Sequence, residues 1–415
     1  RDDLVTGVQT CALPIYYIIS TYLLFLLGAQ FVFAPALGWL LTFYLIKKLW
    51  QQTSDTPPEE RIRIPIGVWV WIVCISVIGI ALVVGHLDWG FSTVKTIKSF
   101  INSFLRTWAL LALFPLIGCL NIRPQIIYRA ISILSLQTLI LVPITYGLSL
   151  TGLEMPLYTS TLMAKIGGNS QRYYAISPYV IKSGETRLFL FAPWAPALAF
   201  ACNVHFFLSS RDPDIKWRFI GMIGCAAAIV GSVSRMGIIC LVGIPILVTF
   251  LVNLTEPAMQ ITAGIGSFIG GIFGPQLLMI ARNLKDSFSG QRSASSRVRS
   301  ALARLSHRKW EEDAPIWGHA IKVGKGPDVV AKMPIGSHHT WYGALYTHGI
   351  VGFIGILIPI VYTFIELLIK AQRSKIATTA LTILLVCILF SFGENLETLA
   401  YLYWPGLVVV GMGLK

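Results

Sequence analysis

Charged residues are scarce in this chain. Asp, Glu, Lys and Arg make up 13% of its 415 residues, whereas hydrophobic residues make up 55%, and the mean hydropathy is +0.70. This leaves too little polar surface to cover a water-soluble fold of this length. The composition therefore excludes an ordinary soluble enzyme and indicates an integral membrane protein.

Patterns for metal binding and disulfide bonding are also missing. Cysteine spacings fit neither a metal site nor a disulfide framework, and no Asp-x-Asp pair occurs in the segments predicted below to face outward. We expect no metal and no cofactor. The net charge of +14 is spread over short linkers and one long loop, without the interleaved aromatic residues of a nucleic-acid-binding domain. Membrane lipids and phosphates, not nucleic acid, are the expected partners.

The first residues do not resemble the rest of the protein. Residues 5–15, VTGVQTCALPI, are similar to the in-frame translation of a sequencing-library adapter. We treat residues 1–15 as an artefact, expect the native amino terminus to be missing, and exclude this stretch from fold reasoning. The remainder, residues 16–415, is predicted to form a single integral membrane domain.

Long apolar segments dominate that domain. A bilayer core takes about 20 apolar residues per helix, and lipid-facing backbone must satisfy its own hydrogen bonds, so we predict an all-α, polytopic bundle of about eleven transmembrane helices. The apolar segments lie at roughly 17–49 (one long or two short spans, interrupted near Pro35), 65–85, 103–121, 126–148, 187–208, 217–233, 236–253, 260–281, 346–370, 376–393 and 399–414.

Short basic linkers predict the orientation. Lys and Arg recur in linkers between alternate pairs of predicted helices, near residues 47–63, 123–129, 211–218 and 370–375. Linkers rich in these residues are typically cytoplasmic. Counting helices from them places three regions on the outer face: residues 149–186, the turn at Ser234-Arg235, and a long loop, residues 282–345, predicted to contain short helices. We expect a bacterial inner (cytoplasmic) membrane protein with its site facing the periplasm or exterior.

The motif with the clearest chemistry is Ser337-His338-His339-Thr340-Trp341-Tyr342, followed by Gly349-Ile350-Val351-Gly352. A histidine at the outer mouth of the bundle can act as a general base near neutral pH. The motif resembles the last outer loop of the O-antigen ligases and O-antigen polymerases, which has a His-Asn-Ser/Thr-Tyr-Leu pattern with Gly-Ile-x-Gly about ten residues on. Both histidines are candidate catalytic residues: register in this resemblance favours His338, and His339, which stands in place of the Asn, is the alternative. Trp341 stands in place of the Tyr.

Two arginine elements extend the resemblance. Gly231-Ser232-Val233-Ser234-Arg235-Met236-Gly237 is similar to the Ser-Arg-Gly element of that family, and an arginine at that depth needs a charge or a cavity. Ser295-Ser296-Arg297-Val298-Arg299 and Pro315-Ile316-Trp317-Gly318 are similar to its Arg-containing helix and Pro-Leu-Phe-Gly turn. Two positions apart on a helix, Arg297 and Arg299 point to different faces, so only one is expected to reach a ligand.

The resemblance implies a function. It implies a glycosyltransferase that takes an oligosaccharide from a polyprenyl pyrophosphate donor and transfers it to a saccharide or lipid-core acceptor. His338 would accept the proton of the acceptor hydroxyl, and Arg235 with Arg297 or Arg299 would bind the pyrophosphate. Glu394, Glu397 and Trp341 are candidate residues on the acceptor side. A transporter or flippase and a non-catalytic assembly scaffold are the alternatives, and the choice between ligase, polymerase and protein glycosylation is open.

Overall fold

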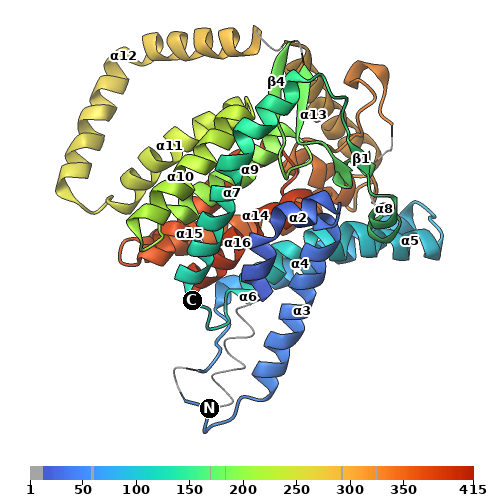
Figure 1. The fold of residues 1–415 in the computed structure, drawn as a ribbon, viewed down its shortest axis with the longest axis horizontal. Helices are drawn as coiled ribbons and strands as arrows, with labels where there is room; N and C mark the ends of the chain where they lie inside the picture. Colours follow the sequence, from blue (N-terminus) through green and yellow to red (C-terminus); the bar gives the residue numbers. More distant parts are fainter. Residues whose placement is uncertain (1–12, 58–59, 169, 183, 291–292, 323–324) are drawn as a thin grey trace.

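A computed structural model describes residues 13–57, 60–168, 170–182, 184–290, 293–322 and 325–415. Most of the segment predicted to be an artefact, residues 1–12, lies outside the described residues. The described chain is mostly helical (Figure 1). Its α-helices are α2 (Thr21–Leu26), α3 (Gln30–Trp50), α4 (Ile66–Asp88), α5 (Thr93–Ser99), α6 (Leu110–Ile117), α7 (Pro124–Leu150), α8 (Thr161–Gly167), α9 (Ala195–Ser209), α10 (Ile215–Gly231), α11 (Arg235–Val252), α12 (Pro257–Gly290), α13 (Ser293–Asp313), α14 (Thr340–Ala371), α15 (Lys375–Ser391) and α16 (Leu396–Leu414).

Five of the described helices are long and apolar enough to cross a membrane: α3, α4, α7, α11 and α14. A sixth candidate is a pair bent by 41°, in which α5 and the π-helix η1 (Phe100–Trp108) precede α6. The helices α9 and α15 are apolar but have only 15 and 17 residues, fewer than a bilayer core usually needs. The prediction of a helical membrane protein agrees with this, whereas the number of about eleven spans is not confirmed.

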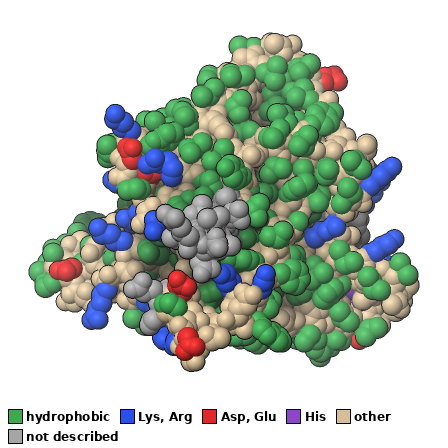
Figure 2. Space-filling view, turned by 60° about the horizontal axis from the view of Figure 1, so that its bottom comes forward, with side chains coloured by type: hydrophobic (Ala, Val, Ile, Leu, Met, Phe, Trp, Pro, Cys, Tyr) green, Lys and Arg blue, Asp and Glu red, His purple; other side chains and the backbone are tan. Residues whose placement is uncertain are grey.

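Exposed apolar side chains support the same conclusion. Hydrophobic side chains cover much of the face drawn in Figure 2. On α4, the side chains of Trp69, Val73 and Ile80 are each about half exposed or more. Water would make such a surface an aggregation site, whereas lipid tails solvate it.

Two predicted boundaries differ from the structure. The break expected near Pro35 lies instead at residues 27–29, where Gly28 has a φ of 66°, and Pro35 is inside α3. The segment 282–345 is not a single loop with short helices: α12 continues to Gly290, and α13 alone has 21 residues. In Figure 1, α12 reaches out beyond the bundle.

The first predicted outer loop, residues 149–186, carries almost all of the described sheet structure. β1 (Tyr158–Thr159) pairs antiparallel with β2 (Ala175–Ile176), and β3 (Tyr179–Lys182) pairs antiparallel with β4 (Glu185–Leu188). The helix α8 and the 3-10 helix η2 (Gln171–Tyr173) both lie in the connection between β1 and β2. Two short hairpins are thus the exception to the predicted all-α fold.

The linkers and loops gather at two ends of the bundle. At one end, Arg129 of α7 bonds Asp212 in the α9–α10 turn, and Gln372 donates to the carbonyl of Leu251. At the other end, Arg187 of β4 donates to the carbonyl of Val233 at 3.5 Å, and Thr340 donates to the carbonyl of Glu394. The three regions predicted to face outward therefore share one end.

Candidate functional site

His338 lies at the end of the bundle where the hairpins, α13 and the start of α14 meet. Its φ of 62° is a left-handed conformation that is uncommon outside glycine, although histidine adopts it more readily than most residues. This turn sends two consecutive histidines to different surroundings. The half-buried His338 ring contacts Trp194, with ring centroids 6.4 Å apart, whereas His339 caps α14 and its Nδ1 accepts the N–H of Tyr342.

Three cations from separate segments surround His338. Burial, together with the charges of Arg299, Arg172 and Lys322, lowers the pKa of His338 to about 4. Arg299 comes from α13, Arg172 from the 3-10 helix η2, and Lys322 from the segment after α13. The imidazole is therefore neutral at pH 7, and its surroundings favour a negatively charged ligand.

Glu394 is a buried carboxylate that contacts this cluster through Arg299. It lies between α15 and α16, is only 2% exposed, and accepts a hydrogen bond of 2.9 Å from Trp194 Nε1. Its other oxygen faces Arg299 Nη2 at 3.5 Å. Burial raises the pKa of Glu394 to about 7, against the lowering effects of the Arg299 charge and the Trp194 hydrogen bond. This carboxyl group can thus exchange a proton near neutral pH.

A second ion pair lies one helical turn away. Lys322 Nζ is 3.0 Å from Glu397 Oε1, which also accepts a hydrogen bond from Asn395. Glu397 is 3% exposed, and its Oε2 is buried without a hydrogen-bond partner among the described residues. The corner between α15 and α16 therefore presents two buried carboxylates, one to Arg299 and one to Lys322.

The Pro315-Ile316-Trp317-Gly318 motif meets the Gly349-Ile350-Val351-Gly352 motif at a break in α14. Gly349 has non-helical backbone angles (φ 62°, ψ −161°), which frees nearby backbone groups. The segment from Pro315 to Ala320 pairs with them: His319 N–H donates to Tyr346 O at 2.8 Å, and Ile350 N–H donates to Pro315 O at 2.9 Å. Non-helical backbone inside a membrane bundle needs such partners. The Pro-Ile-Trp-Gly motif thus fixes the helix that begins directly after the histidines.

The other predicted residues take different places. Arg297 is exposed on α13, and of the two arginines it is Arg299 that faces Glu394. Trp341 Nε1 donates to Ser391 Oγ and its ring packs near Phe353 and Phe392. The structure thus places Arg299 and Glu394 beside His338 and gives Trp341 a packing role.

Arg235 begins α11 in a neighbouring turn. Its side chain is half-buried, and Gly237 packs against Ala199 of α9. Ala199 is five residues after Trp194, or about 7 to 8 Å along the helix axis. Arg235 is therefore at the same end of the bundle as His338.

Three neighbours of His338 escaped the sequence analysis. Trp194 stands between two prolines, in Pro193-Trp194-Ala195-Pro196 directly before an apolar helix, which could have marked it. Arg172 and Lys322 carry no comparable signal, because nothing in the sequence separates them from nearby basic residues such as Lys165 and Lys325. Only tertiary contacts bring them to the site.

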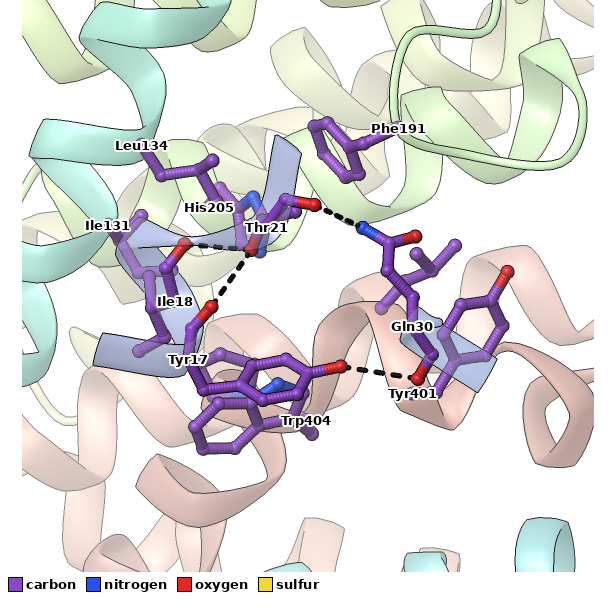
Figure 3. Close-up of a pocket in the computed structure, with 12 residues that line it drawn as sticks. Tyr17, Ile18, Thr21, Gln30, Ile131, Leu134, Phe191, His205, Tyr401 and Trp404 are labelled. Atoms are coloured by element: carbon purple, nitrogen blue, oxygen red, sulfur yellow. Dashed lines mark hydrogen bonds between the residues drawn. The ribbon is translucent and has the colours of Figure 1, made fainter. Parts of the chain in front are cut away.

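Two other features of the described chain bear on chemistry. No group of three or more His, Cys, Asp or Glu residues that could hold a metal ion occurs in the part of the chain that the structure describes. A small pocket between α2, α3, α7, α9 and α16 is lined by His205, Thr21, Gln30 and Tyr401 (Figure 3). Its volume of about 10 Å³ admits roughly one water molecule, so it does not fit a substrate.

The chain was compared with known proteins in two ways. Its sequence matches no known protein family, and it matches no curated protein.

Proposed function

We propose that this protein is a glycosyltransferase of the O-antigen ligase or polymerase type, which transfers an oligosaccharide from a polyprenyl pyrophosphate donor. The observation that carries the proposal is His338, a neutral imidazole with Arg299, Arg172 and Lys322 around it. A base beside an anion-binding cluster suits a reaction in which a hydroxyl loses a proton while a pyrophosphate leaves.

The reaction balances with these groups alone. The acceptor oxygen attacks the anomeric carbon, the bond from that carbon to the phosphate oxygen breaks, and the pyrophosphate keeps the electron pair. His338 accepts the proton of the acceptor hydroxyl, and Arg299 with Arg235 offsets the charge that grows on the leaving group. Burial lowers the pKa of His338 most, and the three cations lower it further. Bound phosphates offset the cations, so they should raise this pKa in part.

The membrane setting belongs to the same proposal. We place the chain in a bacterial inner membrane, with the His338 end facing the periplasm or exterior, where such donors are presented. Counting the shorter apolar helices α9 and α15 as spans would bring the number of spans closer to the predicted eleven. Protease treatment of intact spheroplasts tests this orientation: a tag inserted after Lys325 should be cleaved, and protection of the tag would reverse the orientation.

The catalytic assignment is tested by reconstitution. The purified chain in vesicles should join sugar chains from a polyprenyl pyrophosphate donor, and His338→Ala should lower the rate roughly 10²- to 10⁴-fold. His339→Ala is the matched control and should keep most of the activity, because His339 faces Tyr342 and Phe392. Chelation of divalent ions should have no effect. A correctly inserted His338→Ala variant that works at the parent rate would remove His338 from the mechanism.

A transporter or flippase is the second candidate. The break in α14 at Gly349 and the bent pair formed by α5, η1 and α6 are features that transporters use around a substrate site. A transporter would move lipid-linked sugars across vesicles without joining them, and a non-catalytic scaffold would do neither. The reconstituted assay therefore separates all three candidates.

The acceptor is a further question within the proposed class. Deleting the gene should leave single repeat units on the cell surface if the protein is a polymerase, and unattached long chains if it is a ligase. The length distribution of surface polysaccharide distinguishes the two outcomes.

A further inference from the structure

Two ion pairs join α13 and the segment directly after it to the corner between α15 and α16. Arg299 faces Glu394 at 3.5 Å, and Lys322 faces Glu397 at 3.0 Å. The carboxylate side chains are 2% and 3% exposed, whereas 42% of the Arg299 side chain and 30% of the Lys322 side chain remain exposed. Each cation thus has one side against a buried carboxylate and another side open.

The same two cations act on a common neighbour. Their charges and that of Arg172 all reach His338. Two of these three cations pair with carboxylates, whereas Arg172 is exposed and forms no ion pair within the described ranges. The surroundings of His338 therefore keep positive charge that the buried carboxylates do not offset.

We propose that Arg299, Lys322 and Arg172 form one cradle for the phosphates of the ligand, and that Glu394 and Glu397 hold Arg299 and Lys322 until the ligand displaces them. The class of ligand rests on the function proposed above. A carboxylate presents two acceptor oxygens to a cation in the way that a phosphate does. The arginine supplies a planar pair of donors and the lysine a compact charge.

Both carboxylates can give up their cations. The Arg299–Glu394 contact is long for a charged hydrogen bond, and Glu394 can bind a proton instead, as its raised pKa indicates. Glu397 keeps its hydrogen bond from Asn395 when Lys322 leaves. Exchange of partners therefore need not leave a bare charge at Glu394, whereas at Glu397 the hydrogen bond from Asn395 only reduces the cost of the uncompensated charge.

Binding of inorganic pyrophosphate to the full chain in detergent, measured by calorimetry at pH 7.5, tests the cradle. Lys322→Ala should raise the Kd roughly tenfold, and Arg172→Ala should also weaken binding. Glu397→Gln should lower the Kd, because the competing charge is gone while the shape is kept. Glu366→Gln and Lys370→Ala, which break a 2.8 Å pair toward the far end of α14, are the controls and should leave the Kd unchanged.

Three results would overturn the proposal: a parent that does not bind pyrophosphate, a Lys322→Ala variant with the parent Kd, or weaker binding by Glu397→Gln. Lys322→Gln, which keeps the length and most of the packing of the side chain, repeats the test if the alanine variant does not fold. Normal pyrophosphate binding with no sugar transfer would reject the proposed enzyme and keep the cradle. Sugar transfer by a parent whose Kd for pyrophosphate does not change in the Lys322 and Glu397 variants would keep the proposed enzyme and reject the cradle.

Discussion

Two arginines pair with buried carboxylates at opposite ends of the bundle, about 22 Å apart along α9, and the pairs differ in geometry. Arg129 bonds Asp212 through two donors at 2.8 and 2.9 Å, whereas Arg299 approaches Glu394 only to 3.5 Å. Burial alone would raise the pKa of Asp212, but the Arg129 hydrogen bonds and the N–H of Asp214 lower it below its usual value. The pKa of Glu394 instead rises to about 7.

The Arg129–Asp212 pair has the geometry of a structural ion pair, whereas the Arg299–Glu394 pair has that of an exchangeable one. The bidentate pair keeps Asp212 ionised at all physiological pH values and ties α7 to the α9–α10 turn. The looser pair leaves Glu394 close to its protonation midpoint and leaves Arg299 partly open. We therefore expect substitutions at the first pair to affect stability and substitutions at the second to affect ligand chemistry.

The largest expected effect is on sugar transfer. Arg299→Ala should lower the rate roughly 10²-fold, because it removes a donor that stabilises charge on the leaving group. Arg297→Ala, two residues away on an exposed position, is the control and should change it little. Steady-state transfer rates in vesicles measure both, and equal losses in the two variants would contradict the choice of Arg299.

The stability of the protein, in contrast, should depend more on the Arg129–Asp212 pair than on the Arg299–Glu394 pair. Arg129→Ala leaves the fully buried Asp212 without its partner and should lower the free energy of unfolding by about 2 to 3 kcal/mol, less than a fully buried pair would because Arg129 is partly exposed. Glu394→Gln should not lower it and should raise it at pH 7, because the glutamine carries no charge for burial to disfavour. Thermal unfolding in detergent measures the difference, and a larger loss for Glu394→Gln would erase the distinction between the pairs.

The pH dependence of stability should also differ between the two carboxylates. The pKa of Glu394 is raised in the folded state, so its contribution is present below its unfolded pKa near 4.5 and is lost as the pH rises through about 7. The pKa of Asp212 is lowered, so its contribution is present above its unfolded pKa and is lost in acid. Melting temperatures from pH 5 to 8 should fall less in Glu394→Gln than in the parent; parallel curves would show that Glu394 does not titrate there.

The smallest expected effect concerns Trp194. Trp194→Phe removes the hydrogen bond to Glu394 but keeps most of the ring packing against His338, so transfer should fall roughly three- to tenfold. Trp341→Phe removes a similar bond, to Ser391, away from His338. It should have less effect on transfer, and a ranking in the other order would move Trp341 into the site.

Sequence reasoning reached the helical membrane class because apolar run length reflects what a bilayer requires of a helix. It failed on helix ends such as that of α12, because hydropathy does not show where an amphipathic helix stops. Within the site, the motif order brought His338 and Arg299 into consideration, and the predicted turn between the last two helices did so for Glu394. The spacing of Arg297 and Arg299 indicated that one of them would point elsewhere. Arg172 and Lys322 could not be predicted, because the fold of two loops, and no local pattern, carries them to His338.

The central claim is that the cationic site around His338 opens to the outer face and binds phosphates. Ser337→Cys, next to His338 and half-buried, tests it with a membrane-impermeant maleimide on intact spheroplasts, with the parent as background. We expect labelling from outside that slows when a short polyprenyl pyrophosphate is added. Labelling only after the membrane is broken, or at a rate that the pyrophosphate does not change, would contradict the account.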